Sequence, residues 1–359
     1  MTGAGAPILE RDRELDLANG ALEAARGGNG RVVLVSGPAG IGKTRLLSEL
    51  RERAPELRLL SARGGELERQ LPWGVVRQLL DPVLSTLSPA DRDELFTGAG
   101  RLAASIFEGD LREGATGRDL AALVYGLYWV LTGLSARGPV ALVVDDAHWA
   151  DDESLRWLAF IGARLDGLRA SIFAAVRSGD PGAARSPLVE LAASAESVVV
   201  EPAPLSEDGA AALISSVGGV RAEPLFVAAC QRVAVGNPFL LQELIRQLSA
   251  ERVDPTDANV ERVASLRPGT IARSVILRLA RLPPEATALA QAVAVLGPGQ
   301  EARDAAALAG LDAGAAALAH QSLAESHILA AGERPEFVHP LVGSAVYEDL
   351  PALVRAQSH

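Results

Sequence analysis

One run of this chain has the residue types and spacing that bind phosphate. It fits the pattern G-x-x-x-x-G-K-[ST] and consists of Gly37, Pro38, Ala39, Gly40, Ile41, Gly42, Lys43 and Thr44. Its glycines let backbone N–H groups converge on a phosphate at the start of a helix, where the helix dipole favours anions. Lys43 is the only lysine among 34 basic residues. We predict that Lys43 bridges the β- and γ-phosphates of a nucleotide, that the Thr44 hydroxyl binds Mg²⁺, and that Arg45 completes the binding segment.

Two carboxylates follow a second apolar run. Residues 141–144 are predicted to form a buried strand, and Asp145 and Asp146 come directly after it. We predict that Asp145 holds Mg²⁺, directly or through water, and that Asp146 orients or activates the attacking water. A strand-end aspartate can equally cap a helix. Behind a phosphate-binding loop, however, the pair indicates a Walker B element.

Further candidates occur singly, and each has a structural alternative. Arg177 ends an apolar run and is predicted to sense the γ-phosphate, the alternative being an exposed loop arginine. Pro238 opens a helix and is predicted to contact the adenine ring, the alternative being a plain helix start. His339 is either a phosphate contact or a buried histidine. His148 and Trp149 are predicted to pack under the sheet, the alternative being contact with the nucleotide.

The elements that must position these residues alternate between strands and helices. The predicted strands are Val32–Ser36, Leu57–Ser61, Val140–Asp145, Ser171–Val176 and Ser197–Val200. Helical patterns lie between them, so the fold class is α/β, with a P-loop NTPase core in which a parallel sheet lies between two helical layers. The segment from Leu71 to Leu134 is predicted to be inserted helices. Its apolar stretch Leu120–Leu134 is expected to be a buried helix too short to span a bilayer.

Beyond the sheet the pattern is helical. Residues 206–250 predict an all-helical lid, and Asp254–Gly269 a linker. The predicted elements after it are helices at 270–282, 285–296, 302–309 and 314–325, a hairpin over 327–338, and a helix from Leu341 onward. Helices before a hairpin indicate a winged helix. The predicted domains are a P-loop ATPase core at 1–203, the lid at 204–262, and a winged-helix domain at 263–359 that is truncated at its C-terminal end.

Composition and missing motifs exclude several function classes. The net charge of −11 and the pI near 5.1 argue against non-specific binding to nucleic acid or to an anionic membrane. Cys230 is the only cysteine, which excludes an intrachain disulfide and a cysteine-based metal site. No apolar signal segment begins the chain, and a cytoplasmic location is expected. The single lysine leaves none for the N-K-x-D motif of GTPases, so adenine is the favoured base.

Taken in order, these motifs resemble the nucleotide-binding region of large ATP-binding regulators of the LuxR type, which are STAND-class, AAA+-related P-loop proteins. The matching phrases are Leu9–Leu15, Gly37–Thr44, Arg69–Leu79, Asp145–Asp151, Gly236–Phe239 and Phe337–Val342. The resemblance places Arg11 beside the base, although Glu10 stands where the family has glycine. The family's long helical-repeat sensor and LuxR helix-turn-helix have no counterpart in the sequence. We therefore expect an N-terminal fragment, or a short member that does not bind a promoter by itself.

The resemblance implies an ATP/ADP switch that also needs Mg²⁺. Such regulators hold ADP in a closed resting state and exchange it for ATP when an inducer or protein partner opens them. They then oligomerise and activate transcription, and they hydrolyse ATP slowly. DNA is expected to bind only through a further C-terminal domain, and no membrane is expected to take part. Two alternatives stay open: an AAA+ remodelling or loader ATPase whose output is hydrolysis, and a nucleotide-dependent scaffold.

Overall fold

The computed structural model describes residues 8–65, 69, 71–108, 117–266, 276, 278–297, 299–326, 328–332, 334–338 and 340–350. The chain divides into two units. The α/β unit comprises Arg11–Pro38 and Lys43–Pro202. The C-terminal unit comprises Ala203–His359, the N-terminal segment Met1–Glu10, and the P-loop tip Ala39–Gly42.

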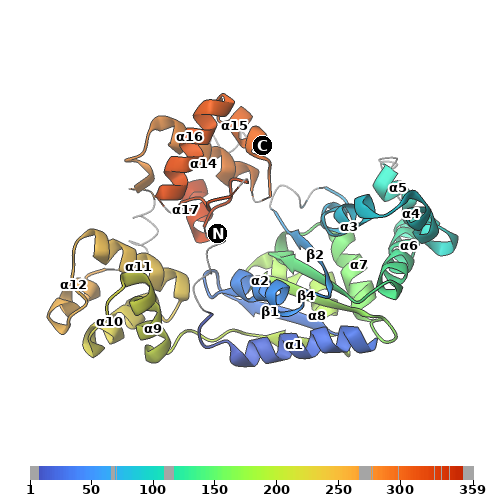
Figure 1. Ribbon diagram of the computed structural model, residues 1–359, viewed down its shortest axis with the longest axis horizontal. Helices are drawn as coiled ribbons and strands as arrows, with labels where there is room; N and C mark the ends of the chain where they lie inside the picture. The colour runs from blue at the N-terminus through green and yellow to red at the C-terminus, as the bar shows by residue number, and fades with distance from the viewer. Residues whose placement is uncertain are drawn as a thin grey trace. The chain divides into compact units, whose positions relative to one another are not determined.

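The α/β unit contains a five-stranded parallel sheet (Figure 1). Its strands are β1 (Val32–Gly37), β2 (Arg58–Arg63), β3 (Val140–Asp145), β4 (Ala170–Arg177) and β5 (Ser197–Val200). Their spatial order is β2-β3-β4-β1-β5. The register pairs Gly37 with Arg177 and Arg63 with Asp145. Parallel strands bring their carboxyl ends to one edge of the sheet, where open α/β sheets bind ligands.

All five predicted strands are present, and β3 and β5 have the predicted ends. Both faces of the central strands are buried, which explains why they are continuous apolar runs instead of alternating ones. The main correction concerns β2, which extends to Arg63 beyond the predicted end at Ser61. Its last residues are less apolar, and pairing with β3 keeps them in the sheet.

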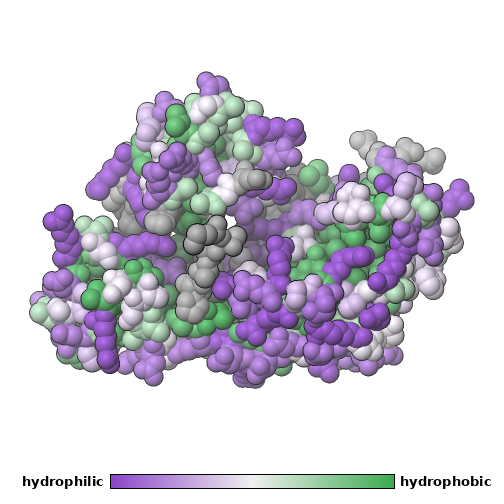
Figure 2. Space-filling view, viewed as in Figure 1, coloured by the Kyte–Doolittle hydropathy of each residue, from purple (hydrophilic) through white to green (hydrophobic). Residues whose placement is uncertain are grey.

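Helices cover both faces of this sheet (Figure 1). They are α1 (Asp12–Gly27), α2 (Lys43–Arg53), α3 (Gly74–Thr86), α4 (Pro89–Leu95), α5 (Ala104–Glu108), α6 (Gly117–Ala136), α7 (Asp152–Gly162) and α8 (Ser186–Ala192), with 3-10 helices at Gly98–Ala103, Ala147–Trp149 and Pro181–Ala184. α1 and α2 contact β1, β3 and β4. Side chains of α3, α6, α7 and α8 share an apolar core with Val32 and Leu34 of β1. The outer surface of α1 is mainly hydrophilic (Figure 2).

The apolar stretch predicted to be a buried helix belongs to α6. α6 runs for 20 residues and continues past both ends of this apolar stretch. Among the described residues, this is the one helix long and apolar enough to span a bilayer by length and composition, over Asp119–Ala136. Four of its side chains are nevertheless fully inside the core of the α/β unit: Leu127, Val130, Leu131 and Leu134.

The C-terminal unit is helical over most of its described residues. Its helices are α9 (Glu207–Gly218), α10 (Pro224–Ala234), α11 (Pro238–Ala250), α12 (Val260–Ala264), α14 (Pro284–Leu296), α15 (Ala302–Leu308), α16 (Ala313–Glu325) and α17 (Pro340–Asp349), with a 3-10 helix at Asp257–Asn259. The helix predicted over 270–282 lies mostly outside the described residues. The predicted hairpin is reduced in the described residues to one antiparallel bridge, between Leu329 and Phe337.

The linker predicted over Asp254–Gly269 was wrong over Asp257–Ala264. The 3-10 helix and α12 occupy it, and Val263 and Leu266 are buried in a core shared with α9, α10 and α11. Asp257 accepts hydrogen bonds from the first amides of α10, those of Leu225 at 2.9 Å and Phe226 at 3.2 Å. Residues that signal a turn locally therefore serve here as a cap for a distant helix.

Candidate nucleotide-binding site

The P-loop follows β1 and turns at two glycines. Gly40 has a φ of 86° and Gly42 a φ of 103°, values in the left-handed region that side chains rarely adopt. The loop ends where α2 begins, at Lys43. The predicted order of strand, glycine-rich loop and helix is therefore confirmed, with the helix start following the loop directly.

Lys43 turns its amine back onto the loop. Its side chain is only 7% exposed, and Nζ donates to the carbonyl oxygens of Gly37 at 2.7 Å and Pro38 at 2.9 Å. Burial lowers the pKa of Lys43, and Arg177 acts in the same direction, whereas Asp146 and Asp145 oppose the shift. The charge is thus held beside the loop in the part of the chain where phosphates are predicted to bind.

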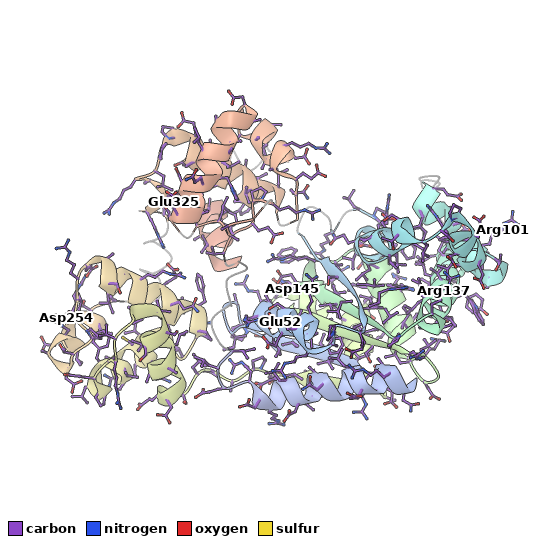
Figure 3. All side chains as sticks on the ribbon, in the orientation of Figure 1. Glu52, Arg101, Arg137, Asp145, Asp254 and Glu325 are labelled. Carbon is purple, nitrogen blue, oxygen red and sulfur yellow. The ribbon has the colours of Figure 1, made fainter. Side chains whose placement is uncertain are left out.

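Thr44 and Asp145 lie together, as their predicted shared role at Mg²⁺ requires. The Thr44 hydroxyl donates to Oδ2 of Asp145 at 2.7 Å, and Asp145 lies at the carboxyl end of β3 (Figure 3). Burial raises the pKa of Asp145, and neighbouring Asp146 adds to the shift. No cluster of three or more His, Cys, Asp or Glu suited to a metal occurs among the described residues. A hydroxyl and one carboxylate suit Mg²⁺, which takes its remaining ligands from phosphates and water.

Asp146 has a strained backbone and a basic partner that sequence reasoning missed. Its φ of 47° and ψ of 41° are left-handed. One carboxylate oxygen accepts from Arg63, at 3.2 Å from Nε and 3.1 Å from Nη2. Gln78 of α3 in turn bonds both the N–H and the C=O of Arg63. The sequence signal for this partner was an arginine at the end of β2. The predicted strand ended at Ser61, so Arg63 was left outside the predicted sheet.

His148 links the ends of β3 and β4. It is 1% exposed, and its Nδ1 accepts the backbone N–H of Arg177 at 3.3 Å. Burial lowers the pKa of His148 to about 4, with Asp180 opposing the shift. The imidazole is therefore neutral near pH 7 and able to accept this bond. The prediction that His148 packs in the interior is confirmed.

This burial should make folding stability depend on pH. The unfolded imidazole titrates near 6.5 and the folded one near 4, so the unfolded state binds a proton first as the pH falls. We expect the contribution of His148 to be intact above about pH 6.5 and to fall by about 3 kcal/mol by pH 4. Denaturant unfolding of wild type and His148→Asn, whose amide oxygen replaces Nδ1 as acceptor, measures it. Asp145 titrates in both proteins, so the difference isolates the histidine. Parallel pH profiles would contradict the assignment.

Asp151 connects the segment after β3 to the start of α3, two segments that are far apart in the sequence. Its buried carboxylate accepts the amides of Trp73 at 2.9 Å, Val75 at 3.1 Å and Ser154 at 2.8 Å. The Ser154 hydroxyl accepts from Val76 at 3.1 Å. The start of α3 is thereby tied to the segment after β3. The function of the residues Leu71–Leu79 as an anchor for the inserted helices was invisible in the sequence.

For the remaining predicted site residues, the structure gives a position in the fold but no contact that tests the predicted role. Arg11 is buried directly before α1. Glu10 has a φ of 53°, which explains why glycine suits this position in the family that the chain resembles. Pro238 is the first residue of α11, and Arg177 is the half-buried last residue of β4. His339 lies outside the described residues.

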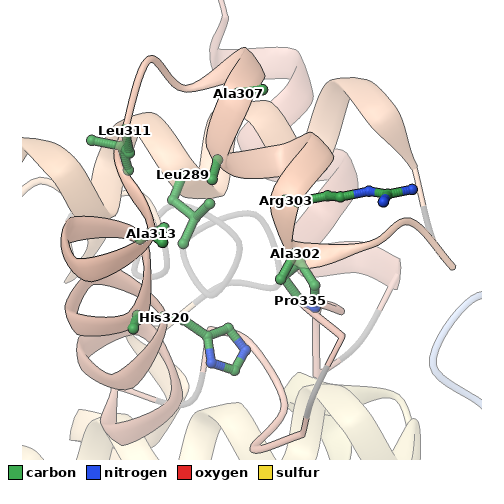
Figure 4. A pocket seen from close by; sticks show the side chains of 11 residues that line it. Leu289, Ala302, Arg303, Ala307, Leu311, Ala313, His320 and Pro335 are labelled. Carbon is green, nitrogen blue, oxygen red and sulfur yellow. The ribbon is translucent and has the colours of Figure 1, made fainter.

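A separate cavity lies among the last helices of the C-terminal unit (Figure 4). Its volume is about 450 Å³, and alanine and leucine side chains of α14, α15 and α16 form most of its wall. The His320 ring borders it, and the Nε2 atom of that ring is buried without a hydrogen-bond partner among the described residues. No predicted nucleotide-binding residue lines this cavity.

Comparison with known families agrees with the P-loop and Walker B geometry. Residues 7–174 match the family model described as "AAA ATPase domain". Over this segment the chain is similar to AAA ATPase domains. The segment contains the P-loop, Thr44, and both carboxylates after β3. Outside it lie Arg177 and the whole helical part of the C-terminal unit.

Among curated relatives, an uncharacterised protein of Rhizobium meliloti is 29% identical over 174 residues. The match covers 42% of this chain but only 16% of that protein's length. This chain therefore matches only a small part of a much longer protein.

Solved structures give weaker likenesses. The Orc1 protein of Aeropyrum pernix in complex with DNA is 16% identical, with a TM-score of 0.44 over 98% of this chain and 95% of that one. A Walker-type ATPase of Pyrococcus abyssi is 16% identical, with a TM-score of 0.43 over 94% and 96%. The RuvB branch migration motor of Thermotoga maritima is 15% identical, with a TM-score of 0.41 over 96% of each chain.

Proposed function

We propose that this chain is an ATP/ADP-binding switch of the STAND class, the nucleotide-binding portion of a LuxR-type transcriptional regulator. The observation that carries nucleotide binding is the arrangement of Lys43, Thr44 and Asp145 around the start of α2. The match to an AAA ATPase domain supports the same conclusion. In this proposal the core spans 1–203, a helical lid 204–262, and a winged-helix domain 263–359.

Each proposed residue has a task in the bound state. Lys43 contacts the β- and γ-phosphates, while Thr44 and Asp145 hold Mg²⁺. Bound Mg²⁺ supplies positive charge that neutralises the phosphates. Asp146 orients the attacking water, and Arg177 senses the γ-phosphate. The remaining contacts, Arg11 and Pro238 at the base and His339 at phosphate, are proposed on the resemblance to the family.

The ion pair between Arg63 and Asp146 supports a switch with slow turnover. The Arg63 guanidinium occupies one oxygen of the Asp146 carboxylate, so that oxygen is not available to orient a water while the pair is closed. Hydrolysis then requires Arg63 to leave Asp146. The alternative is a remodelling or loader ATPase, which the AAA ATPase match also fits, and in which this pair would open in every cycle.

The wider roles follow from the resemblance and remain part of the proposal. An inducer or protein partner exchanges ADP for ATP in the cytoplasm, and the ATP form oligomerises. DNA is reached through a domain that lies beyond this sequence. No membrane takes part.

Two measurements test the proposal. Mass analysis of nucleotide released from purified protein should detect ADP, and the steady-state turnover of ATP should lie well below the roughly 1–100 s⁻¹ of typical phosphoryl-transfer enzymes. Turnover within that range would favour the remodelling alternative. Absence of both retained nucleotide and measurable ATP or ADP binding would refute a nucleotide-dependent function altogether.

A further inference from the structure

The side chain of Asn237 connects the start of α11 to the tip of the P-loop, both within the C-terminal unit. Its Oδ1 accepts the amides of Phe239 at 3.1 Å and Leu240 at 3.2 Å, which caps α11. Its Nδ2 donates to the carbonyl oxygen of Ala39 at 2.9 Å. Only one orientation of the amide group satisfies both ends. The side chain is 9% exposed, so water competes little for these bonds.

A second bond joins the same two segments. The backbone N–H of Phe239 donates to the carbonyl oxygen of Gly40 at 3.3 Å. The segments are also in direct contact, since a Cβ added at Gly40 would lie 2.5 Å from Oδ1 of Asn237. Two consecutive P-loop carbonyls therefore accept hydrogen bonds, that of Ala39 from the N-cap Asn237 and that of Gly40 from Phe239 in the first turn of α11.

These bonds fix the direction of two P-loop amides. In a planar trans peptide the C=O of one residue points opposite to the N–H of the next, and the described residues contain no cis bond. With the carbonyls of Ala39 and Gly40 facing α11, the N–H groups of Gly40 and Ile41 face away from it. Inward-turned amides of such a loop are the groups that bind phosphate.

The side chain of Phe239 extends the connection to the last helices. It is buried in the apolar core that also contains Leu289 of α14 and Leu323 of α16. A rotation of the P-loop peptides would therefore disturb the start of α11 together with a side chain of that core.

We infer that Asn237 is a positioning residue for phosphate binding, which holds the Ala39 and Gly40 peptides in the orientation that presents their following amides to the phosphate chain. This inference rests on the proposed nucleotide-binding function. The ligand class is the diphosphate part of a nucleoside di- or triphosphate. Asn237 acts through the loop and is proposed to touch neither base nor phosphate.

Two substitutions that keep the helix cap test this role. Serine and aspartate are both good N-cap residues, but serine is too short to reach Ala39, and aspartate turns a carboxylate oxygen toward the Ala39 carbonyl. Affinities of the full chain are measured for a fluorescent ADP analogue and for pyrophosphate as its competitor. We expect Asn237→Ser to weaken both by about two- to tenfold. Asn237→Asp should weaken both further.

The matched control is Asn259→Asp. Asn259 belongs to the same unit and also donates Nδ2 to a backbone carbonyl at 2.9 Å. Because that carbonyl is the one of Asp254 and not of a P-loop residue, Asn259→Asp should leave both affinities unaltered. Wild-type affinities in Asn237→Ser would overturn the inference. A weakened affinity for the ADP analogue with an unchanged affinity for pyrophosphate would also overturn it, because the effect would then lie at the base. Lys43→Ala distinguishes a failure of the proposed nucleotide binding from a failure of the positioning role of Asn237. If wild type binds ADP and Lys43→Ala does not, an unaffected Asn237→Ser refutes the positioning role alone.

Discussion

Replacement of Lys43 by alanine should weaken nucleotide binding by about ten- to hundredfold. The lost contact is a charge-assisted hydrogen bond to phosphate, a class worth roughly 1.5–3 kcal/mol. The ammonium is already held beside the loop by the carbonyls of Gly37 and Pro38, so little ordering cost opposes its use. Titration with a fluorescent ATP analogue measures the change.

Two further variants separate charge from packing. Lys43→Met keeps most of the buried side-chain volume and should bind as weakly as Lys43→Ala. Arg51→Ala removes an exposed positive charge from the same helix, α2, and should bind like wild type. Equal affinity of Lys43→Ala and wild type would remove the basis for a phosphate-binding loop here.

Asp146→Asn should abolish most ATP hydrolysis while leaving ATP bound. Loss of a group that accepts or orients a proton typically costs about a hundredfold or more in rate. Asparagine tolerates the left-handed backbone at this position, so the local fold should persist. Asp145→Asn should instead weaken the Mg²⁺-dependent part of binding, because it removes a charged oxygen beside Thr44. Single-turnover hydrolysis and binding with and without Mg²⁺ distinguish the two.

Asp152→Asn is the matched control. Asp152 is an exposed carboxylate in the segment that follows Asp145 and Asp146, and its partner is Arg185. The substitution should change neither binding nor hydrolysis. If Asp145→Asn and Asp146→Asn altered both measurements equally, the proposed division of tasks between these carboxylates would be wrong.

Much of the α/β unit could be predicted because its signals are local. A glycine-rich turn between a buried strand and a helix identifies itself within residues 31–50. The strands that bring Thr44 and Asp145 together are fully buried runs, which leave a clear apolar signature. Parallel pairing then places their carboxyl ends at one edge without further information.

The missed residues act over long distances in the chain. Arg63 meets Asp146 across 83 positions, and Asn237 meets Ala39 across 198. An arginine at a strand end, or an asparagine before a helix, has an ordinary local explanation, so nothing in its neighbours points to a partner. The same limit explains Asp257, whose turn-like surroundings concealed its role at the start of α10. Such contacts become visible only when the packing is known.

The burial of Lys43 has a practical consequence for following this protein. Apart from the α-amino group, its side chain is the only amine in the sequence, because every other basic side chain except histidine is a guanidinium. A lowered pKa leaves more of that amine uncharged and nucleophilic than an ordinary lysine at the same alkaline pH. An amine-selective acylating reagent therefore has one side-chain target, and that target lies where phosphate is proposed to bind. Protection of a single peptide from acylation would report what fraction of the molecules carry ligand, even in an unpurified mixture.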